Sequence, residues 1–141
     1  MSATATVSDP NRKHLEAART LIAKGDLKQA ALTLNKAQKQ LPNDPRVFML
    51  AGLMAEKSGN INGAFEALRR SVAMAPDWGP GLLELALLLA RQNQFKEAVE
   101  TAEKVAALEP RNLQVLAGVV DIAHRAGHTE MAVQHLRRGL E

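Results

Sequence analysis

Residues 24–30 read KGDLKQA, and related stretches follow at a constant interval along the chain. They are SGNINGA at 58–64, QNQFKEA at 92–98 and AGHTEMA at 126–132. The second residue of each stretch is glycine or asparagine, and both residues tolerate the left-handed backbone that closes a helix. The pattern therefore predicts four tight helical hairpins, each of which turns at this position.

Prolines and capping residues mark where the predicted helices begin and end. Three prolines recur at the same interval and are each expected to stop a second helix, since proline cannot continue one: Pro42, Pro76 and Pro110. Asp44 and Pro45 supply a cap and a first-turn proline for the helix that follows, and Pro80 is expected in a first turn as well. Asp26 and Asn60 are expected to cap second helices.

The same register gives the expected helix ranges. First helices are predicted at 11–24, 45–58, 79–92 and 113–126. Second helices are predicted at 28–41, 62–75, 96–109 and 130–139. A composition with 46% hydrophobic residues and only 3% aromatic residues, dominated by alanine and leucine, is typical of close-packed helices.

Two further columns of residues recur at the same period. One column lies early in each predicted first helix and holds His14, Phe48, Leu82 and Leu116. The other lies early in each predicted second helix and holds Ala30, Ala64, Ala98 and Ala132. With these columns the chain resembles the tetratricopeptide repeat family over about residues 11–141. The resemblance implies an all-α, right-handed superhelix of about four antiparallel helix hairpins, with repeats at 11–44, 45–78, 79–112 and 113–141, after a disordered segment at 1–10.

In this family the first helices line a concave groove that binds peptides or partner proteins. Helical spacing on the first helices places an apolar strip in that groove, with basic residues along its edge. The predicted partner-binding residues are Arg12, Leu15, Arg19, Arg46, Met49, Leu53, Lys57, Leu83, Leu87, Arg91 and Arg125.

Two binding modes known in the family do not fit these positions. Members that clamp a terminal carboxylate use Lys, Asn and Arg side chains where this chain has Leu15, Arg19, Leu50, Pro80 and Glu84. Members that grip a substrate backbone with a ladder of asparagines have them where this chain has Glu16, Leu50, Glu84 and Gly118. The apolar strip and its basic edge instead predict a partner with apolar anchors and acidic flanks.

The segment GLLELALLLA (residues 81–90) is apolar on nearly every side, whereas a surface helix should show one polar face. Either neighbouring helices bury both of its sides, or a partner helix, an extended peptide or a second copy of the chain covers one of them. At the C-terminal end of the array, Val133, Leu136 and Leu140 are expected to be exposed, because no polar capping helix follows them.

Other kinds of function find little support in the sequence. The chain has no cysteine and a formal charge of only +3, and its basic residues are scattered, so no thiolate chemistry, metal, cofactor or nucleic acid is expected. His124, His128 and His135 are close in sequence, but the turn residue Gly127 separates them, and solvated surface histidines are expected. No phosphate loop or nucleophile motif occurs, so the chain is not expected to be an enzyme.

No segment of the sequence is expected to enter a membrane. The longest apolar run, Leu85–Ala90, is far shorter than the ~20 residues that span a bilayer, and the N-terminus lacks an apolar segment of signal-peptide length. A cytoplasmic location is favoured for the chain as given.

These observations predict a non-catalytic protein-interaction module that holds a peptide or partner helix in an apolar, basic-rimmed groove. A second copy of the chain is a further candidate partner. The alternative is a regulatory or substrate-docking region of a larger enzyme, such as a glycosyl- or sulfotransferase. The final Leu140-Glu141, which resembles a cloning remnant, is consistent with this alternative.

Overall fold

A computed structural model describes residues 9–140, and side chains as far as Gly139. The predicted disordered segment at 1–10 therefore falls mostly outside the described residues. The eight helices of the described part are α2 (Arg12–Lys24), α3 (Leu27–Gln40), α4 (Pro45–Lys57), α5 (Ile61–Met74), α6 (Gly79–Arg91), α7 (Phe95–Leu108), α8 (Leu113–Arg125) and α9 (Thr129–Leu140). The helix ends agree with the predicted ranges to within one residue, and no strand occurs between residues 9 and 140.

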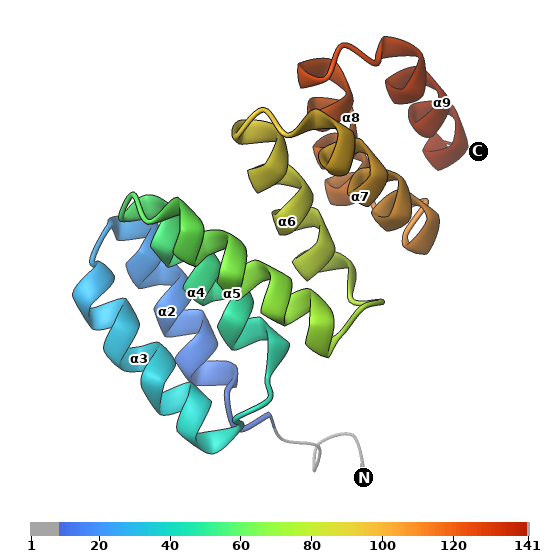
Figure 1. The fold of residues 1–141 in the computed structure, drawn as a ribbon. Coiled ribbons are helices and arrows are strands. Elements are labelled where there is room, and N and C mark those ends of the chain that lie inside the picture. The colour runs from blue at the N-terminus through green and yellow to red at the C-terminus, as the bar shows by residue number, and fades with distance from the viewer. Residues whose placement is uncertain (1–8, 141) are drawn as a thin grey trace, which may run out of the picture. The chain divides into compact units, whose positions relative to one another are not determined.

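The helices form two compact units, Met1–Met74 and Ala75–Glu141. In the first unit, α2 pairs with α3 and α4 pairs with α5, and α4 also packs against both α2 and α3 (Figure 1). The second unit repeats this arrangement, since α6 pairs with α7, α8 pairs with α9, and α8 packs against α6 and α7. Each unit is thus two stacked helical hairpins, and the prediction of an all-α hairpin fold is confirmed.

The turns inside the hairpins have the predicted backbone. The only non-glycine residue of the described chain with positive φ is Asn93, at 61°, and it occupies the same position as Gly25, whose φ is 82°. Gly59 and Gly127 have φ values of 86° and 76°. The left-handed conformation therefore recurs at all four turns, which explains why only Gly and Asn occupy this column.

The predicted caps are present where the helices begin. The Asp26 carboxylate accepts a hydrogen bond from the Gln29 amide at 3.3 Å, and the Asn60 side chain accepts one from the Gly63 amide at 2.9 Å. Pro45 and Pro80 lie in the first turns of α4 and α6. These local signals place the helix ends independently of the packing between hairpins.

Small residues let the two helices of a hairpin approach closely. Ala30, Ala64 and Ala98 are fully buried, and Ala132 is 8% exposed. In the α4–α5 hairpin, a Cβ atom added to Gly52 would lie 2.7 Å from Leu68 Cγ. Leu68 thus occupies the space that the absent Gly52 side chain leaves, and the two residues form one packing element.

The searched helices of the described chain include none whose length and apolarity would let it cross a membrane.

Candidate functional site

The predicted site lies on the first helices of the hairpins. Within the first unit these helices are α2 and α4, and within the second unit they are α6 and α8. In both units the two first helices contact each other directly. Each unit therefore offers its own face, built from two neighbouring first helices.

Three of the predicted apolar residues are buried under this face. Leu15, Met49 and Leu83 are 8%, 4% and 7% exposed. The Leu83 side chain fills the space above Gly118, where an added Cβ would lie 2.7 Å from Leu83 Cδ1. These three side chains are packed inside the fold and leave little surface for a partner.

The apolar surface that remains is smaller than the sequence suggested. Leu53 on α4 and Leu87 on α6 are each half-buried, so each leaves part of its side chain open. Ala117 on α8 is exposed. Of the apolar side chains predicted to line the groove, only Leu53 and Leu87 therefore offer a partner part of their surface.

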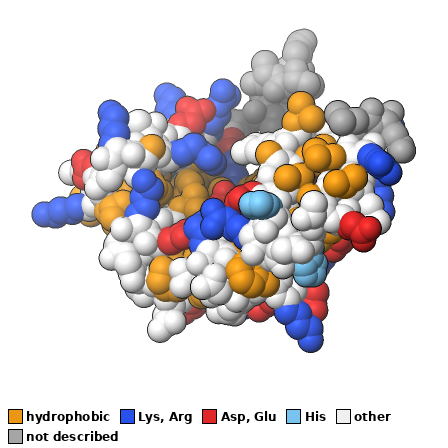
Figure 2. Space-filling view, turned by 90° about the horizontal axis from the view of Figure 1, so that it is seen from above, with side chains coloured by type: hydrophobic (Ala, Val, Ile, Leu, Met, Phe, Trp, Pro, Cys, Tyr) orange, Lys and Arg blue, Asp and Glu red, His pale blue; other side chains and the backbone are white. Residues whose placement is uncertain are grey.

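The basic residues of the face are mostly exposed, but several already have acidic neighbours. Arg12 Nε lies 3.3 Å from Glu16 Oε1, and Arg125 Nε lies 3.2 Å from Asp121 Oδ1. Exposed pairs four residues apart on a helix contribute only about 0.3–0.5 kcal/mol. An acidic partner could replace either carboxylate at little cost. In the view of Figure 2, Lys and Arg side chains lie among acidic and hydrophobic ones.

Arg46 differs from the other predicted basic residues because it is held in a structural network. Its guanidinium donates to Asp44 through Nε at 2.9 Å and Nη2 at 2.8 Å, and to Asp9 through both terminal nitrogens. The buried Asn11 side chain donates to Asp44 as well, at 2.9 Å. Arg46 therefore joins the segment before α2 to the start of α4, and it has little capacity left for a partner.

The network shifts the pKa values of its members. Hydrogen bonds to Asp9 and Asp44 raise the pKa of Arg46 above its usual range. The hydrogen bond from Arg46 lowers the pKa of Asp9. Burial by itself would raise the pKa of Asp44, but the hydrogen bonds from Arg46 and Asn11 outweigh it, and the pKa of Asp44 is lowered.

The lowered carboxylate pKa values predict a pH dependence of stability. A carboxylate with a depressed folded-state pKa stabilises the fold above its unfolded pKa, near about 4, and loses this contribution as the pH falls through the folded value. We expect the Met1–Met74 unit to lose stability as the pH falls below about 4, as measured by urea unfolding. The variant Arg46→Gln should flatten this slope, and the control Arg19→Gln should keep it. An identical slope for wild type and Arg46→Gln would contradict the prediction.

Arg19 and Lys57 are the predicted basic residues that stay available. Both are exposed, and neither forms an ion pair within the described part of the chain. Lys57 lies one turn beyond Leu53 on α4. The first unit thus combines two accessible cations with one partly open leucine.

The apolar segment 81–90 is buried almost throughout. Nine residues of α6 are buried, including Leu82, Leu85 and Leu88, and within the segment only Glu84 and Leu87 are half-buried. This burial favours the interpretation that the segment packs within the fold. Its apolar composition therefore gives no sign of a partner.

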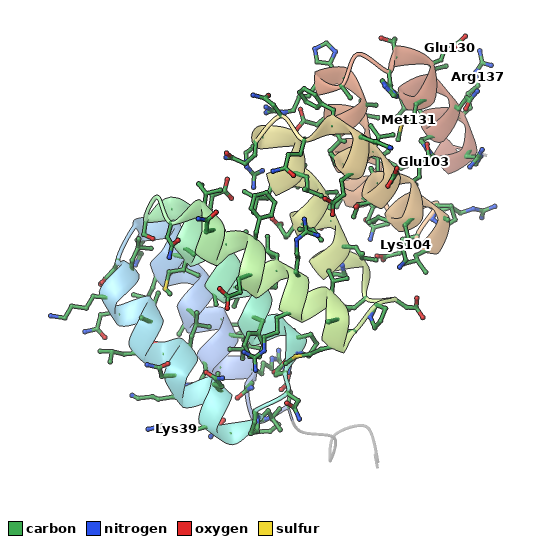
Figure 3. All side chains as sticks on the ribbon, in the orientation of Figure 1. Lys39, Glu103, Lys104, Glu130, Met131 and Arg137 are labelled. Carbon is green, nitrogen blue, oxygen red and sulfur yellow. The ribbon has the colours of Figure 1, made fainter. Side chains whose placement is uncertain are left out.

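The prediction of solvated histidines is wrong for His135. Its side chain on α9 is buried, with 4% exposure, and its Nε2 lies 3.1 Å from Glu103 Oε1 on α7. Figure 3 labels Glu103 on the side of α7 that faces α9. The other two histidines, His124 and His128, are exposed as expected. Among the described residues, no three His, Cys, Asp or Glu side chains come together as a metal site.

The geometry of the hairpins agrees with a comparison of the sequence with known families. A model described as tetratricopeptide repeat matches residues 15–77 and 83–141. The chain belongs to the tetratricopeptide repeat family. The resemblance found in the sequence is thereby confirmed, and the fold is of a kind typical of protein–protein interaction modules.

Individual relatives are distant and much longer. The chain is 27% identical over 89 residues to human tetratricopeptide repeat protein 7A, a match that covers 63% of the chain and 10% of that protein. It is 26% identical over 123 residues to the Arabidopsis thaliana protein CTR9 homolog, covering 83% of the chain and 11% of that protein. The chain thus spans about a tenth of the length of these curated relatives.

A solved structure of Pseudomonas aeruginosa PilF is similar in fold. It matches with a TM-score of 0.79 and 16% identity, over 92% of this chain and 60% of that one. At this level of identity the likeness shows the fold alone.

Proposed function

We propose that the chain is a non-catalytic protein-interaction module that binds a partner segment through its first helices. The observation that carries the proposal is the combination of Arg19, Lys57 and Leu53 in the first unit. Two exposed cations without an ion-pair partner among the described residues lie on the same pair of helices as a partly open leucine. Such a face suits a segment with an apolar anchor and acidic flanks.

The buried residues beneath this face support its use for binding. The side chains of Leu15 on α2 and Met49 on α4 are buried, so packing holds both helices in place. These are the helices that carry Arg19 and Lys57. A rigid surface loses little conformational entropy when a partner binds. The exposed pair of Arg12 and Glu16 adds a cation that an acidic partner could recruit.

A selection from a random peptide library tests this proposal. We expect the full chain to enrich sequences with one or two large apolar residues and flanking Asp or Glu. For a selected peptide, Arg19→Gln with Lys57→Gln should weaken binding by about 10-fold, and Leu53→Ser by about 5-fold, in fluorescence anisotropy titrations. The matched control Lys96→Gln with Lys104→Gln, on the second helix α7, should leave the affinity unchanged.

Two results would contradict the proposal. The first is enrichment of basic or purely polar peptides. The second is a selected acidic peptide whose affinity is the same for the wild type and for the variants of Arg19, Lys57 and Leu53. Binding should also weaken as salt is raised, because the contacts between exposed charges are screened.

A second candidate function is a docking or regulatory region within a larger enzyme, such as a glycosyl- or sulfotransferase. The observation in its favour is that sequences similar to this chain occur within proteins about ten times its length. An antibody raised against the chain would detect the native protein in cells, and its mass would decide. A native protein of this chain's own mass would exclude the second candidate.

A further inference from the structure

The outer side of α3 carries a leucine where the other second helices carry polar residues. Leu32 is 50% exposed. Its counterparts in the three later hairpins are Glu66, Glu100 and Gln134, and all three are exposed. The repeat itself thus supplies the comparison, because this column faces solvent in each hairpin and needs no apolar side chain for packing.

Lysines surround Leu32 on the same side of the helix. Lys28 and Lys36 lie four residues before and after it, and Lys39 lies seven residues after it. At about 100° per residue, these four side chains fall within about 80° of the helix circumference. We call them the α3 stripe. Figure 3 shows Lys39 at the end of α3, with its side chain directed away from the ribbon.

The opposite side of α3 accounts for its packing in the hairpin. Ala30, Leu34 and Ala37 are the buried residues of the helix, and they point away from the α3 stripe. Leu32 is therefore not one of the residues that α3 buries in the hairpin. Its apolar surface is left in water at some cost to solubility.

The charges of the α3 stripe are not balanced locally. The helix contains no acidic residue. The acidic residue nearest to it in sequence, Asp26, serves as the N-cap of α3. Lys28, Lys36 and Lys39 form no ion pair within the described residues. The equivalent helices differ, because α5 contains Glu66 and α7 contains three glutamates.

The whole first unit shares this excess of positive charge. Residues 1–74 contain eleven Lys and Arg against six Asp and Glu. Residues 75–141 contain seven Lys and Arg against nine Asp and Glu. The basic character of the protein therefore resides entirely in the unit that carries the α3 stripe, and long-range attraction would steer an acidic partner to this unit.

We propose that the α3 stripe is a second partner-binding surface, which takes an acidic amphipathic helix of another protein. Leu32 contacts apolar side chains of that helix, and Lys28, Lys36 and Lys39 pair with its acidic residues. The surface lies on a second helix, so it is separate from the first-helix face proposed above and does not depend on it. A membrane surface fits less well, because helices that bind membranes bury several large apolar side chains and this stripe has one.

A titration followed by nuclear magnetic resonance tests this proposal. The probe is a synthetic 18-residue helical peptide with leucines on one face and glutamates elsewhere, added to the uniformly labelled full chain. We expect the amide signals of α3 to shift, with a dissociation constant on the order of 10–100 μM for so small a surface. Leu32→Gln should weaken binding by about 10-fold, and Lys36→Gln by about 3-fold.

The repeat also supplies matched controls. Leu32→Gln copies the residue found at this column in α9, so the variant should fold normally, as circular dichroism would verify. Lys104→Gln changes the lysine of α7 that corresponds to Lys36, and it should leave binding unchanged. Shifts confined to α2 and α4 would overturn the proposal while leaving the first-helix face standing. Absence of binding at 1 mM peptide, or binding to anionic vesicles but not to the peptide, would also overturn it.

Discussion

Replacing Leu68 with alanine is expected to lower the free energy of unfolding of the Met1–Met74 unit by about 4 kcal/mol. Leu68 is 1% exposed and fills the space beside Gly52, where α4 and α5 approach closely. The substitution removes three carbon atoms from a buried site where α4 and α5 pack closely, so it leaves a cavity. Amide hydrogen exchange in α4 and α5, measured with and without urea, would report the loss for this unit.

Gly52→Ala gives a second test of the same packing site, because it adds a methyl group on α4 next to the Leu68 side chain of α5. The new Cβ would lie 2.7 Å from Leu68 Cγ and 3.3 Å from the Ala64 carbonyl oxygen. Alanine is favoured over glycine in a helix by about 1 kcal/mol, so we expect a net loss of only about 1–2 kcal/mol from this overpacking.

The double variant should be less destabilised than the sum of the two single variants, by about 1–2 kcal/mol, because the methyl group added at position 52 occupies part of the cavity left by Leu68. Leu32→Ala serves as the control, since the same atoms are removed from an exposed position and the loss should stay below about 0.5 kcal/mol. Additive effects of the two core substitutions would show that Gly52 and Leu68 do not share a packing site.

The sequence predicted the hairpins closely because their signals are local and repeated. The turn residue at Asn93 and the cap at Asp26 act through their own backbone and near neighbours, and neither requires knowledge of the packing. Repetition at a constant period then separates a real turn from a chance glycine. Helix ends could therefore be predicted to within one residue, whereas a single hairpin would have left them uncertain.

Candidate site residues were harder to predict because exposure depends on neighbouring helices. Helical spacing places Leu15, Met49 and Leu83 toward the first-helix face, but it cannot say how deep each side chain lies. The pairing of Arg46 with Asp9 joins residues 37 positions apart, and His135 meets Glu103 across 32 positions. Such contacts follow from tertiary packing and leave no periodic trace in the sequence.

The α3 stripe, by contrast, could have been found from the sequence. Aligning the four repeats sets Leu32 beside two glutamates and a glutamine, and this departure from the column is visible in the sequence itself. The family resemblance implies binding by the first helices, so none of the predicted site residues lies on a second helix. Columns whose residues agree thus predict the fold, and a residue that differs from its column indicates a candidate binding surface.

Substitution of Asp44 by alanine is expected to destabilise the Met1–Met74 unit by about 3 kcal/mol. The carboxylate caps α4 through the Arg46 amide at 3.0 Å and also accepts from the Arg46 guanidinium and the Asn11 side chain. Loss of an N-cap costs about 0.5–2 kcal/mol, and a buried polar group left unpaired costs about 1–3 kcal/mol. Both costs apply here, because Asn11 has no exposed surface and its Oδ1 already has no partner among the described residues.

Two controls separate these contributions. Asp26→Ala removes an exposed cap of α3 and should cost only about 1 kcal/mol, because no buried group depends on it. Asn11→Leu in the Asp44→Ala background replaces the stranded amide with an apolar side chain of similar size and should recover about 1–2 kcal/mol. If Asp44→Ala cost no more than Asp26→Ala in urea unfolding, Asp44 would be an ordinary cap. The network around Arg46 would then contribute nothing to holding residues 9–11 against α4, and the Arg46 guanidinium would again be a candidate for contact with a partner.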